Sequence, residues 1–298
     1  METIRFIQAF SSDFLDQFFI YVTMMGEEYF FMSIVCLFYW CIDKRFGYKL
    51  GFAYLSNGVF NTGLKHLFKV PRPFVKDPSL RVLRLETAGG YSFPSGHTQF
   101  TAAFWTTMAL EFKKKWIYPL GFVLIVLVGL SRMYLGLHTP IDVLVGAALG
   151  IGWVFLSNAL FEAAERTGRK TWLLILVIPA VIGMFFFREE NYFKVVGTFT
   201  GFYVGYLIES RWIRFDVKAS WWMQALKIIL GLAVLLLLKS GIKLILPESI
   251  ISDFARYFLM VIWVTVAAPL IFKPLARFCG SSAKDTTDTT DTPIARDP

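Results

Sequence analysis

Three short groups of polar residues carry the side chains in this sequence that could do chemistry. The first is KHLFKVPRP, which contains Lys65 and Arg72, the second is PSGH at positions 94–97, and the third is SRMYLGLHTPID, which contains Arg132. Lysine and arginine bind phosphate oxygens, and arginine can do so through two parallel hydrogen bonds. Lys65, Arg72 and Arg132 therefore predict a site for a ligand that carries phosphate.

The PSGH group also predicts the start of a helix just after Pro94. The first amides of a helix, here from about Ser95 through His97, have no partner within the helix, and the helix dipole makes this end attractive to anions. Gly96 would let a phosphate approach the backbone closely. We therefore expect Ser95 and Gly96 to bind phosphate and His97 to lie beside it.

The third group ends in a histidine and a carboxylate that could act as a pair. Asp142 follows His138 by four residues, and Pro140 between them is tolerated in the first turn of a helix, so Asp142 could accept the ring N–H of His138. A carboxylate on one ring nitrogen leaves the other free as a nucleophile. We expect His138 to attack phosphorus, and His97 to protonate the leaving alkoxide and later deprotonate a water.

The order and spacing of these residues resemble the phosphatidic acid phosphatase type 2 superfamily. The resemblance implies metal-independent phosphoester hydrolysis through a phosphohistidine intermediate, in a core of six helices. Two weaker similarities, of topology to the glucose-6-phosphatase branch and of MGEEYFF to the sphingosine phosphate phosphatases, leave the lipid open. Bacterial relatives act on undecaprenyl diphosphate, phosphatidylglycerophosphate or lipid A. The signature positions that match are Lys65, Arg72, Pro73, Pro94, Ser95, Gly96, His97, Ser131, Arg132, His138 and Asp142.

The composition indicates that a membrane positions these groups. Hydrophobic residues make up 56% of the chain and charged residues only 17%, with a mean hydropathy of +0.55, which is too apolar for an ordinary soluble domain. We predict an all-α, multi-pass membrane bundle of about nine transmembrane helices. The predicted spans are 24–42, 47–64, 98–112, 116–130, 141–161, 172–187, 195–208, 222–238 and 254–272.

Four regions follow from this pattern. Residues 1–23 have acidic residues where a signal peptide would be basic, so they are predicted to form an amphipathic segment on the membrane surface. Residues 24–161 would form the phosphatase core and 162–275 additional transmembrane helices. The low-complexity tail, 276–298, is predicted to be disordered.

The basic residues in the loops predict how the protein is oriented in the membrane. Lysine and arginine are more frequent in the loops on the side that holds DKRFGYK and Lys113–Lys115, which favours that side as cytoplasmic. The N-terminus and all three polar groups would then be extracytoplasmic, in what we expect to be a bacterial cytoplasmic membrane. Six basic residues crowded between Lys65 and Arg84 run against this bias and need another explanation.

Several other classes of function have little support. The polar groups lack the carboxylate cluster of a two-metal phosphatase, so we expect no metal and no cofactor. The net charge of +8 is spread over loops, which gives no support for nucleic-acid binding. Glu27 and Glu28 are either solvated or recognise a cationic head group, and Lys69 and Lys76 either solvate their loop or contact a second phosphate.

The prediction is an enzyme that hydrolyses a lipid phosphate, a monoester or diphosphate, at the extracytoplasmic face. Its partners would be the lipid phosphate substrate and membrane lipids, and the sequence leaves the oligomeric state open. One alternative is a lipid phosphotransferase that passes the phosphoryl group to another lipid. An alternative of another class is a transporter that binds a lipid phosphate without cleaving it, although binding alone has no use for an oriented nucleophile.

Overall fold

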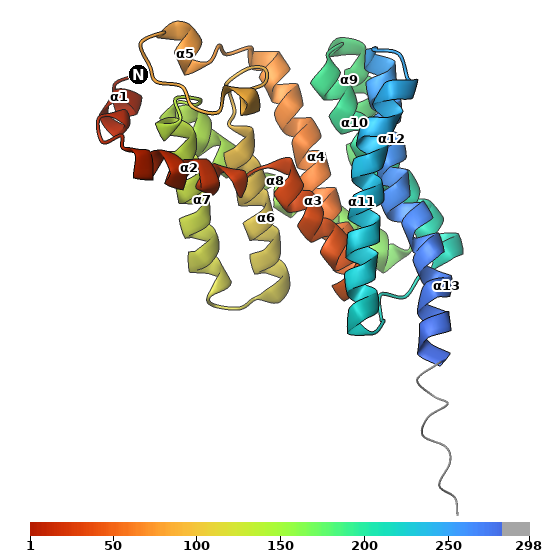
Figure 1. Cartoon of the computed structure of the whole chain (residues 1–298). Coiled ribbons are helices and arrows are strands. Elements are labelled where there is room, and N and C mark those ends of the chain that lie inside the picture. The colour runs from red at the N-terminus through yellow and green to blue at the C-terminus, as the bar shows by residue number, and fades with distance from the viewer. Residues whose placement is uncertain (282–298) are drawn as a thin grey trace, which may run out of the picture.

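The computed structural model describes residues 1–281, with side chains described to residue 275, and it forms a bundle of helices with no strand in that range (Figure 1). Each of the nine predicted spans coincides with helical structure. The helices are α1 Glu2–Gln8, α2 Asp13–Met24, α3 Glu28–Leu37, α4 Lys44–Phe68, α5 Pro73–Lys76, α6 Gly96–Phe112, α7 Ile117–Tyr134, α8 Pro140–Thr167, α9 Leu174–Phe186, α10 Glu190–Ile208, α11 Trp221–Ile245, α12 Ile250–Ile262 and α13 Ala268–Ser281, with short 3-10 or π segments at Phe38–Ile42, Leu85–Thr87, Lys170–Leu173, Glu209–Ile213 and Trp263–Ala267.

Length and composition support a helical membrane protein but not all nine crossings. Within residues 1–281, four helical stretches are long and apolar enough to span a membrane, and the pair formed by α2 and the stretch Glu28–Ile42, bent by 45°, would make a fifth. The remaining helices are too short or too polar to count as membrane spans by length and hydropathy alone. For example, α9 is short, and α4 carries polar residues such as Asn57 and Asn61 along its buried face. The four stretches are Ile117–Tyr134, Pro140–Thr167, Trp221–Ile245 and Ile250–Leu275.

The predicted regional boundaries fall partly within helices. The boundary at residue 161 lies inside α8, which continues to Thr167 before Gly168 ends it in the left-handed conformation. Residues 276–281 of the predicted disordered tail continue α13, and the rest of that tail lies outside the described residues.

Close backbone contact between α6 and α8 sets the position of the polar groups. A Cβ atom at Gly146 would lie 2.7 Å from the carbonyl oxygen of Ser95, and one at Gly150 would collide with the carbonyl of Gln99. Small residues four apart allow two helices to approach in this way. The Ser95 amide also donates to the Asp142 carbonyl at 2.9 Å, so the beginnings of α6 and α8 are joined directly.

The N-terminal segment, predicted to lie on the membrane surface, is also tied to the protein. In Figure 1, α2 runs across the bundle in front of α7. Asp16 accepts hydrogen bonds from Tyr134 and from Arg81 in the long loop before α6, and Arg5 pairs with Asp77 of the same loop at 2.7 Å. The pair of Arg81 with Asp16 accounts for part of the basic crowding between α4 and α6.

The C-terminal helices pack on one another through small residues and are tied to the rest of the chain by one buried charge pair. Gly197 and Gly201 on α10 lie against the backbone of α12 at Phe254 and Phe258, where a Cβ atom would leave too little room. At the other end of α10, the fully buried Glu209 carboxylate accepts from Lys44 at 2.8 Å and from the Tyr48 hydroxyl at 3.2 Å. The pair therefore links α4 to the C-terminal helices.

Removing Glu209 should destabilise the protein by leaving the Lys44 ammonium partly buried without its carboxylate. We expect Glu209→Ala to lower the free energy of unfolding by about 3 kcal/mol, measured by denaturant unfolding in detergent. The matched control is Glu190→Ala, which breaks the exposed pair with Lys194 and should cost less than about 1 kcal/mol. Equal losses in the two variants would contradict a structural role for the buried pair.

Candidate active site

The three polar groups of the sequence meet at one cavity of about 550 Å³. It lies at the end of the bundle where α4 and α7 finish and where α6 and α8 begin. Ser95 and Asp142 are buried behind its wall and do not line it. Six of the predicted site residues do line it: Lys65, Arg72, Gly96, His97, Arg132 and His138.

The ring of His138 is buried between a guanidinium on one side and a carboxylate on the other. Arg72 Nη1 lies 3.0 Å from His138 Nε2, and Asp142 Oδ2 lies 3.7 Å from His138 Nδ1. Because arginine can only donate, Nε2 must accept, which places the ring proton on Nδ1, facing Asp142. The single lone pair of Nε2 therefore faces Arg72 Nη1, which must turn away, toward the phosphate, before Nε2 can attack.

The surroundings of His138 keep its ring neutral. Burial lowers the pKa of His138 well below its usual range, and although Asp142 opposes this shift, the nearby Arg72 and Arg132 cations add to it. Burial also lowers the pKa of Arg72, to about 10, which still leaves its guanidinium protonated at neutral pH. An unprotonated imidazole is the form that can act as a nucleophile.

The predicted direct hydrogen bond from His138 to Asp142 is replaced by a bridged arrangement. Thr139 caps α8, and its amide donates to Asp142 Oδ2 at 2.7 Å, so His138 lies before the helix and not one turn above Asp142. The hydroxyl of Ser92 fills the gap: it donates to Asp142 Oδ2 at 2.7 Å and lies 3.4 Å from His138 Nδ1. Asp142 therefore faces the ring through Ser92.

Ser92 is the site residue that the sequence reasoning missed. It lies within the same loop as the PSGH group, but a lone serine beside a motif has no spacing that marks it. A second missed feature is the amide network of Asn57, Gln99 and Asn61, with contacts of 2.7 and 2.8 Å, which holds the start of α6 against α4. Buried amides inside an apolar helix were the available signal for that network.

The start of α6 differs in one respect from the prediction. Ser95 is the residue before the helix, and its amide is already used by the carbonyl of Asp142, so it has no N–H left for an anion. Its hydroxyl lies 3.0 Å from that of Thr98. The first-turn amides without an intrahelical partner are those of Gly96, His97 and Thr98.

The three predicted cations are held differently. The guanidinium of Arg72 donates to the carbonyls of Gly89, Gly90 and Leu137, in addition to its contact with His138. Lys65 donates to the next carbonyl of the same loop, at Tyr91, over 2.9 Å. The loop at 89–91 thus fixes two of the cations.

Arg132 and His97 keep unused polar atoms. Arg132 donates through Nη1 to the hydroxyls of Thr23 and Thr87, at 2.9 and 3.3 Å. Its Nε and Nη2 atoms, like Nε2 of His97, are buried and find no hydrogen-bond partner within the described part of the chain. Because buried polar groups are nearly always paired, these atoms point to a bound polar ligand.

The structure places the residues whose roles the sequence left open in two different positions, either lining the cavity or away from it. Glu27 pairs with Arg84 at 2.9 Å, and Glu27 and Glu28 both line the cavity. Lys69 and Lys76 are exposed and do not line it. Within residues 1–281, no group of three or more His, Cys, Asp or Glu side chains is arranged to hold a metal ion.

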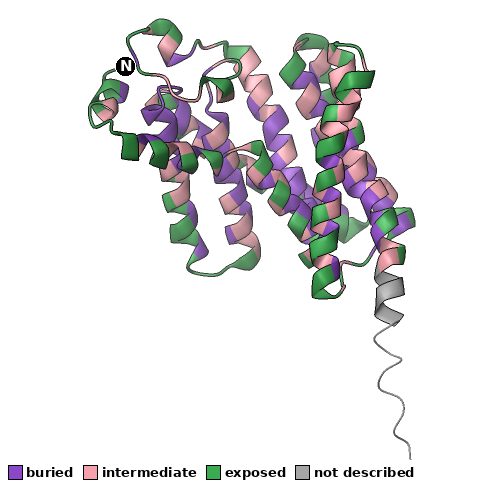
Figure 2. Ribbon diagram, in the orientation of Figure 1, coloured by how far each residue is buried: buried purple, intermediate pink, exposed green. Residues whose placement is uncertain are grey.

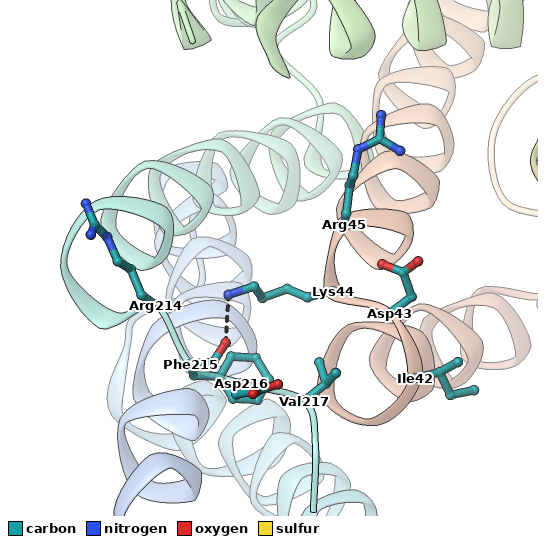
Figure 3. A pocket seen from close by; sticks show the side chains of 8 residues that line it. All are labelled: Ile42, Asp43, Lys44, Arg45, Arg214, Phe215, Asp216 and Val217. Atoms are coloured by element: carbon teal, nitrogen blue, oxygen red, sulfur yellow. Dashed lines mark hydrogen bonds between the residues drawn. The ribbon is translucent and has the colours of Figure 1, made fainter. Parts of the chain in front are cut away.

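A second cavity, of about 490 Å³, lies at the opposite end of α4 (Figure 3). Lys44 crosses it to donate to the Phe215 carbonyl at 2.7 Å, and Arg45 and Arg214 lie on its two sides. None of the predicted site residues lines it, so the candidate active site is the cavity at the other end.

Similarity to known proteins covers both halves of the chain. The profile of the PAP2 superfamily matches residues 46–166, and that of the transmembrane extension of PAP2 superfamily phosphatases matches 193–278. The chain is 27% identical over 183 residues to sphingosine-1-phosphate phosphatase 1 of Rattus norvegicus, a match that covers 58% of this chain and 42% of the relative. The chain thus spans less than half the length of that relative.

Two further relatives complete the comparison. Undecaprenyl-diphosphatase of Sulfolobus acidocaldarius is 31% identical over 153 residues, which cover 50% of this chain and 70% of that protein. The crystal structure of Aquifex aeolicus LpxE superposes with a TM-score of 0.48 at 29% identity, over 52% of this chain and 92% of that one. Both profile matches and the extent of the archaeal match lead to one conclusion: the chain belongs to the PAP2 superfamily.

Proposed function

We propose that the protein is a membrane phosphatase that removes phosphate from a lipid monoester or diphosphate through a phosphohistidine on His138. One observation carries the proposal. Arg132 Nε, Arg132 Nη2 and His97 Nε2 have no hydrogen-bond partner among the described residues, although they are buried and belong to residues that line the same cavity as His138. A phosphate would satisfy them and remove the cost of leaving them unpaired.

The substrate phosphate is bound by cations and by the start of a helix. Arg132 donates through its free nitrogens, Lys65 and Arg72 supply two more positive charges, and the first-turn amides that begin at Gly96 point at the anion. Ser95 contributes by fixing the helix start, since its own amide is occupied. These groups neutralise a phosphate dianion without a metal ion.

The reaction proceeds in two steps. Burial and the nearby Arg132 cation lower the pKa of His97 well below its usual range, so His97 takes its proton from the substrate phosphate as that anion binds. His138 Nε2 attacks phosphorus as the P–O bond to the lipid breaks, and His97 donates that proton to the departing alkoxide. His97 then accepts a proton from water, the water oxygen attacks phosphorus, and the N–P bond breaks to release inorganic phosphate. Asp142 stabilises the positive charge that develops on the His138 ring during the attack.

The membrane setting follows from the two ends of the bundle. The end of the bundle away from the cavity holds Lys44 and Arg45 in the first turn of α4 and Lys113–Lys115 after α6, which supports that end as cytoplasmic and the active site as extracytoplasmic, in a bacterial cytoplasmic membrane. We also propose that the helices that fail the apolarity criterion cross the membrane, making nine. With 25 residues, α4 is about 37 Å long and exceeds the apolar thickness of a bilayer.

The names of the relatives support a lipid phosphate as substrate. One is named for a phosphate monoester of a sphingoid lipid and another for a polyprenyl diphosphate. We propose that residues 24–161 form the phosphatase core and 162–275 an added helical unit. Released inorganic phosphate would distinguish hydrolysis from transfer to a second lipid and from transport without cleavage.

The two histidines should behave differently when removed. His138→Ala deletes the nucleophile, so no substrate should restore turnover. His97→Ala deletes the proton donor and should slow hydrolysis of an alkyl phosphate by about a hundred- to ten-thousandfold. With nitrophenyl phosphate, whose leaving oxygen needs little protonation, phosphohistidine should form in His97→Ala and accumulate.

The measurement is single-turnover transfer of labelled phosphate to the protein. His66→Ala is the control: that third histidine lines the same cavity, but its ring is engaged with Glu189 at 2.8 Å, and the variant should retain turnover within about tenfold of the unmodified protein. Labelling of His138→Ala together with none in His97→Ala would show that the roles are reversed.

Ser92→Ala tests the bridge between His138 and Asp142. The loss of one hydrogen bond to the carboxylate, about 1.5 kcal/mol, should lower kcat about tenfold with little change in KM. Ser33→Ala removes a hydroxyl that bonds only to its own helix and should leave kcat unchanged. An unaltered kcat in Ser92→Ala would mean that the serine only fills space.

Activity should survive chelation with EDTA, because arginine, lysine and the helix amides supply the positive charge that a metal would otherwise provide. Phosphate release is measured before and after EDTA, with a magnesium-dependent phosphatase assayed in parallel. Complete loss of activity that magnesium restores would contradict the mechanism.

A further inference from the structure

The active-site cavity continues well beyond the residues that would bind phosphate. Its other part, which we call the apolar arm, is lined by side chains from α3, α4, α10 and the α12 stretch. Of these helices, α10 packs against both α4 and α12, and α3 packs against α4. In Figure 1, α12 is coloured blue, in the C-terminal half of the chain, to which α10 also belongs. Residues of the apolar arm include Met32, Leu55, Val195, Phe202, Val261 and Val264.

The arm extends along α4 and ends at an aromatic ring. Cavity-lining residues on α4 run from Lys65 at the polar end to Gly51, about 21 Å along the helix axis. At Gly51 the ring of Phe202 occupies the space where a Cβ atom would lie, and this ring packs on Phe52 at 5.1 Å between centroids. Phe202 therefore forms the floor of the arm.

We infer that the apolar arm binds one hydrocarbon chain of the lipid whose phosphate lies at His138. The inference rests on the proposed function, and it assigns the C-terminal helices to substrate selection. Within a single cavity, cations and histidines lie at one end and aliphatic side chains at the other, which is the polarity of a single-chain lipid phosphate. The whole cavity, about 550 Å³, has the size of a site for one small ligand, so it has room for a phosphate together with a single chain.

The arm selects by length more than it adds affinity. A chain taken from a bilayer leaves surroundings that are already apolar, so its transfer into the arm gains little hydrophobic free energy. The Phe202 ring at Gly51, by contrast, limits how far along α4 the chain can extend while its phosphate stays at His138. Side chains from α10 and α12 that narrow the arm should therefore penalise long chains and spare short ones.

The test is hydrolysis of octyl, dodecyl and hexadecyl phosphate, with nitrophenyl phosphate as a substrate that has no chain. Val261→Phe adds bulk to the arm from α12 and should lower kcat/KM for hexadecyl phosphate about ten- to hundredfold. Activity on nitrophenyl phosphate should stay within about twofold, which also shows that the variant is folded. Val195→Phe, from α10, is the second variant and should give the same pattern.

The matched control is Val181→Phe, the same change at a 39% exposed position on α9 that does not line the cavity, and it should change none of the rates. Equal losses on all substrates, or equal behaviour of Val261→Phe and Val181→Phe, would overturn the inference. Equal wild-type rates on single-chain and diacyl phosphates would overturn the single-chain assignment. If the wild-type protein released phosphate from nothing, the proposed function itself would fail.

Discussion

The guanidinium of Arg72 is the group on which the arrangement of the site depends. It has no carboxylate within hydrogen-bond distance among the described residues, and its donors go to three backbone carbonyls and to the ring of His138. Because a buried cation is costly unless every donor is used, the loop at 89–91 and the turn at Leu137 must keep their positions around it. One side chain thus joins the first and third polar groups of the sequence to the loop that precedes the second.

The chemistry of the site was more predictable than its exact contacts. Residue types and spacing brought His97, His138 and the cations to one end of the bundle, because topology alone places the corresponding helix ends together. The spacing of His138 and Asp142 suggested a direct hydrogen bond. However, Thr139 is the N-cap of α8, which leaves a gap between the two side chains that the Ser92 hydroxyl fills. Capping competes with side-chain pairing over the same residues, and the sequence does not show which one prevails.

In the fold, too, the helices were easier to predict from the sequence than the contacts between them. Apolar runs located the long helices well, since a bilayer or a buried core imposes the same requirement on each. Their hydropathy could not show that Asn57 and Asn61 turn inward to support α6, nor that Gly146 and Gly150 bring α8 onto its backbone. The anchoring of the N-terminal segment through Asp16 was also hidden, because its partners Arg81 and Tyr134 come from distant loops and helices. Figure 2 shows the result: buried residues concentrate where the helices meet, and exposed ones cover the outer faces.

The amide-to-carbonyl bond between Ser95 and Asp142 has a consequence for how such a site can change over time. His97 and His138 stand near the beginnings of two different helices, and this bond ties those beginnings together through main-chain atoms. Main-chain atoms are the same in every residue, so substitutions in the surrounding helices leave the spacing of the two imidazoles intact. Only Gly146 and Gly150, which allow α8 to approach the backbone of α6, must remain glycine. The walls around the substrate can therefore diverge while the reacting groups keep their relative positions.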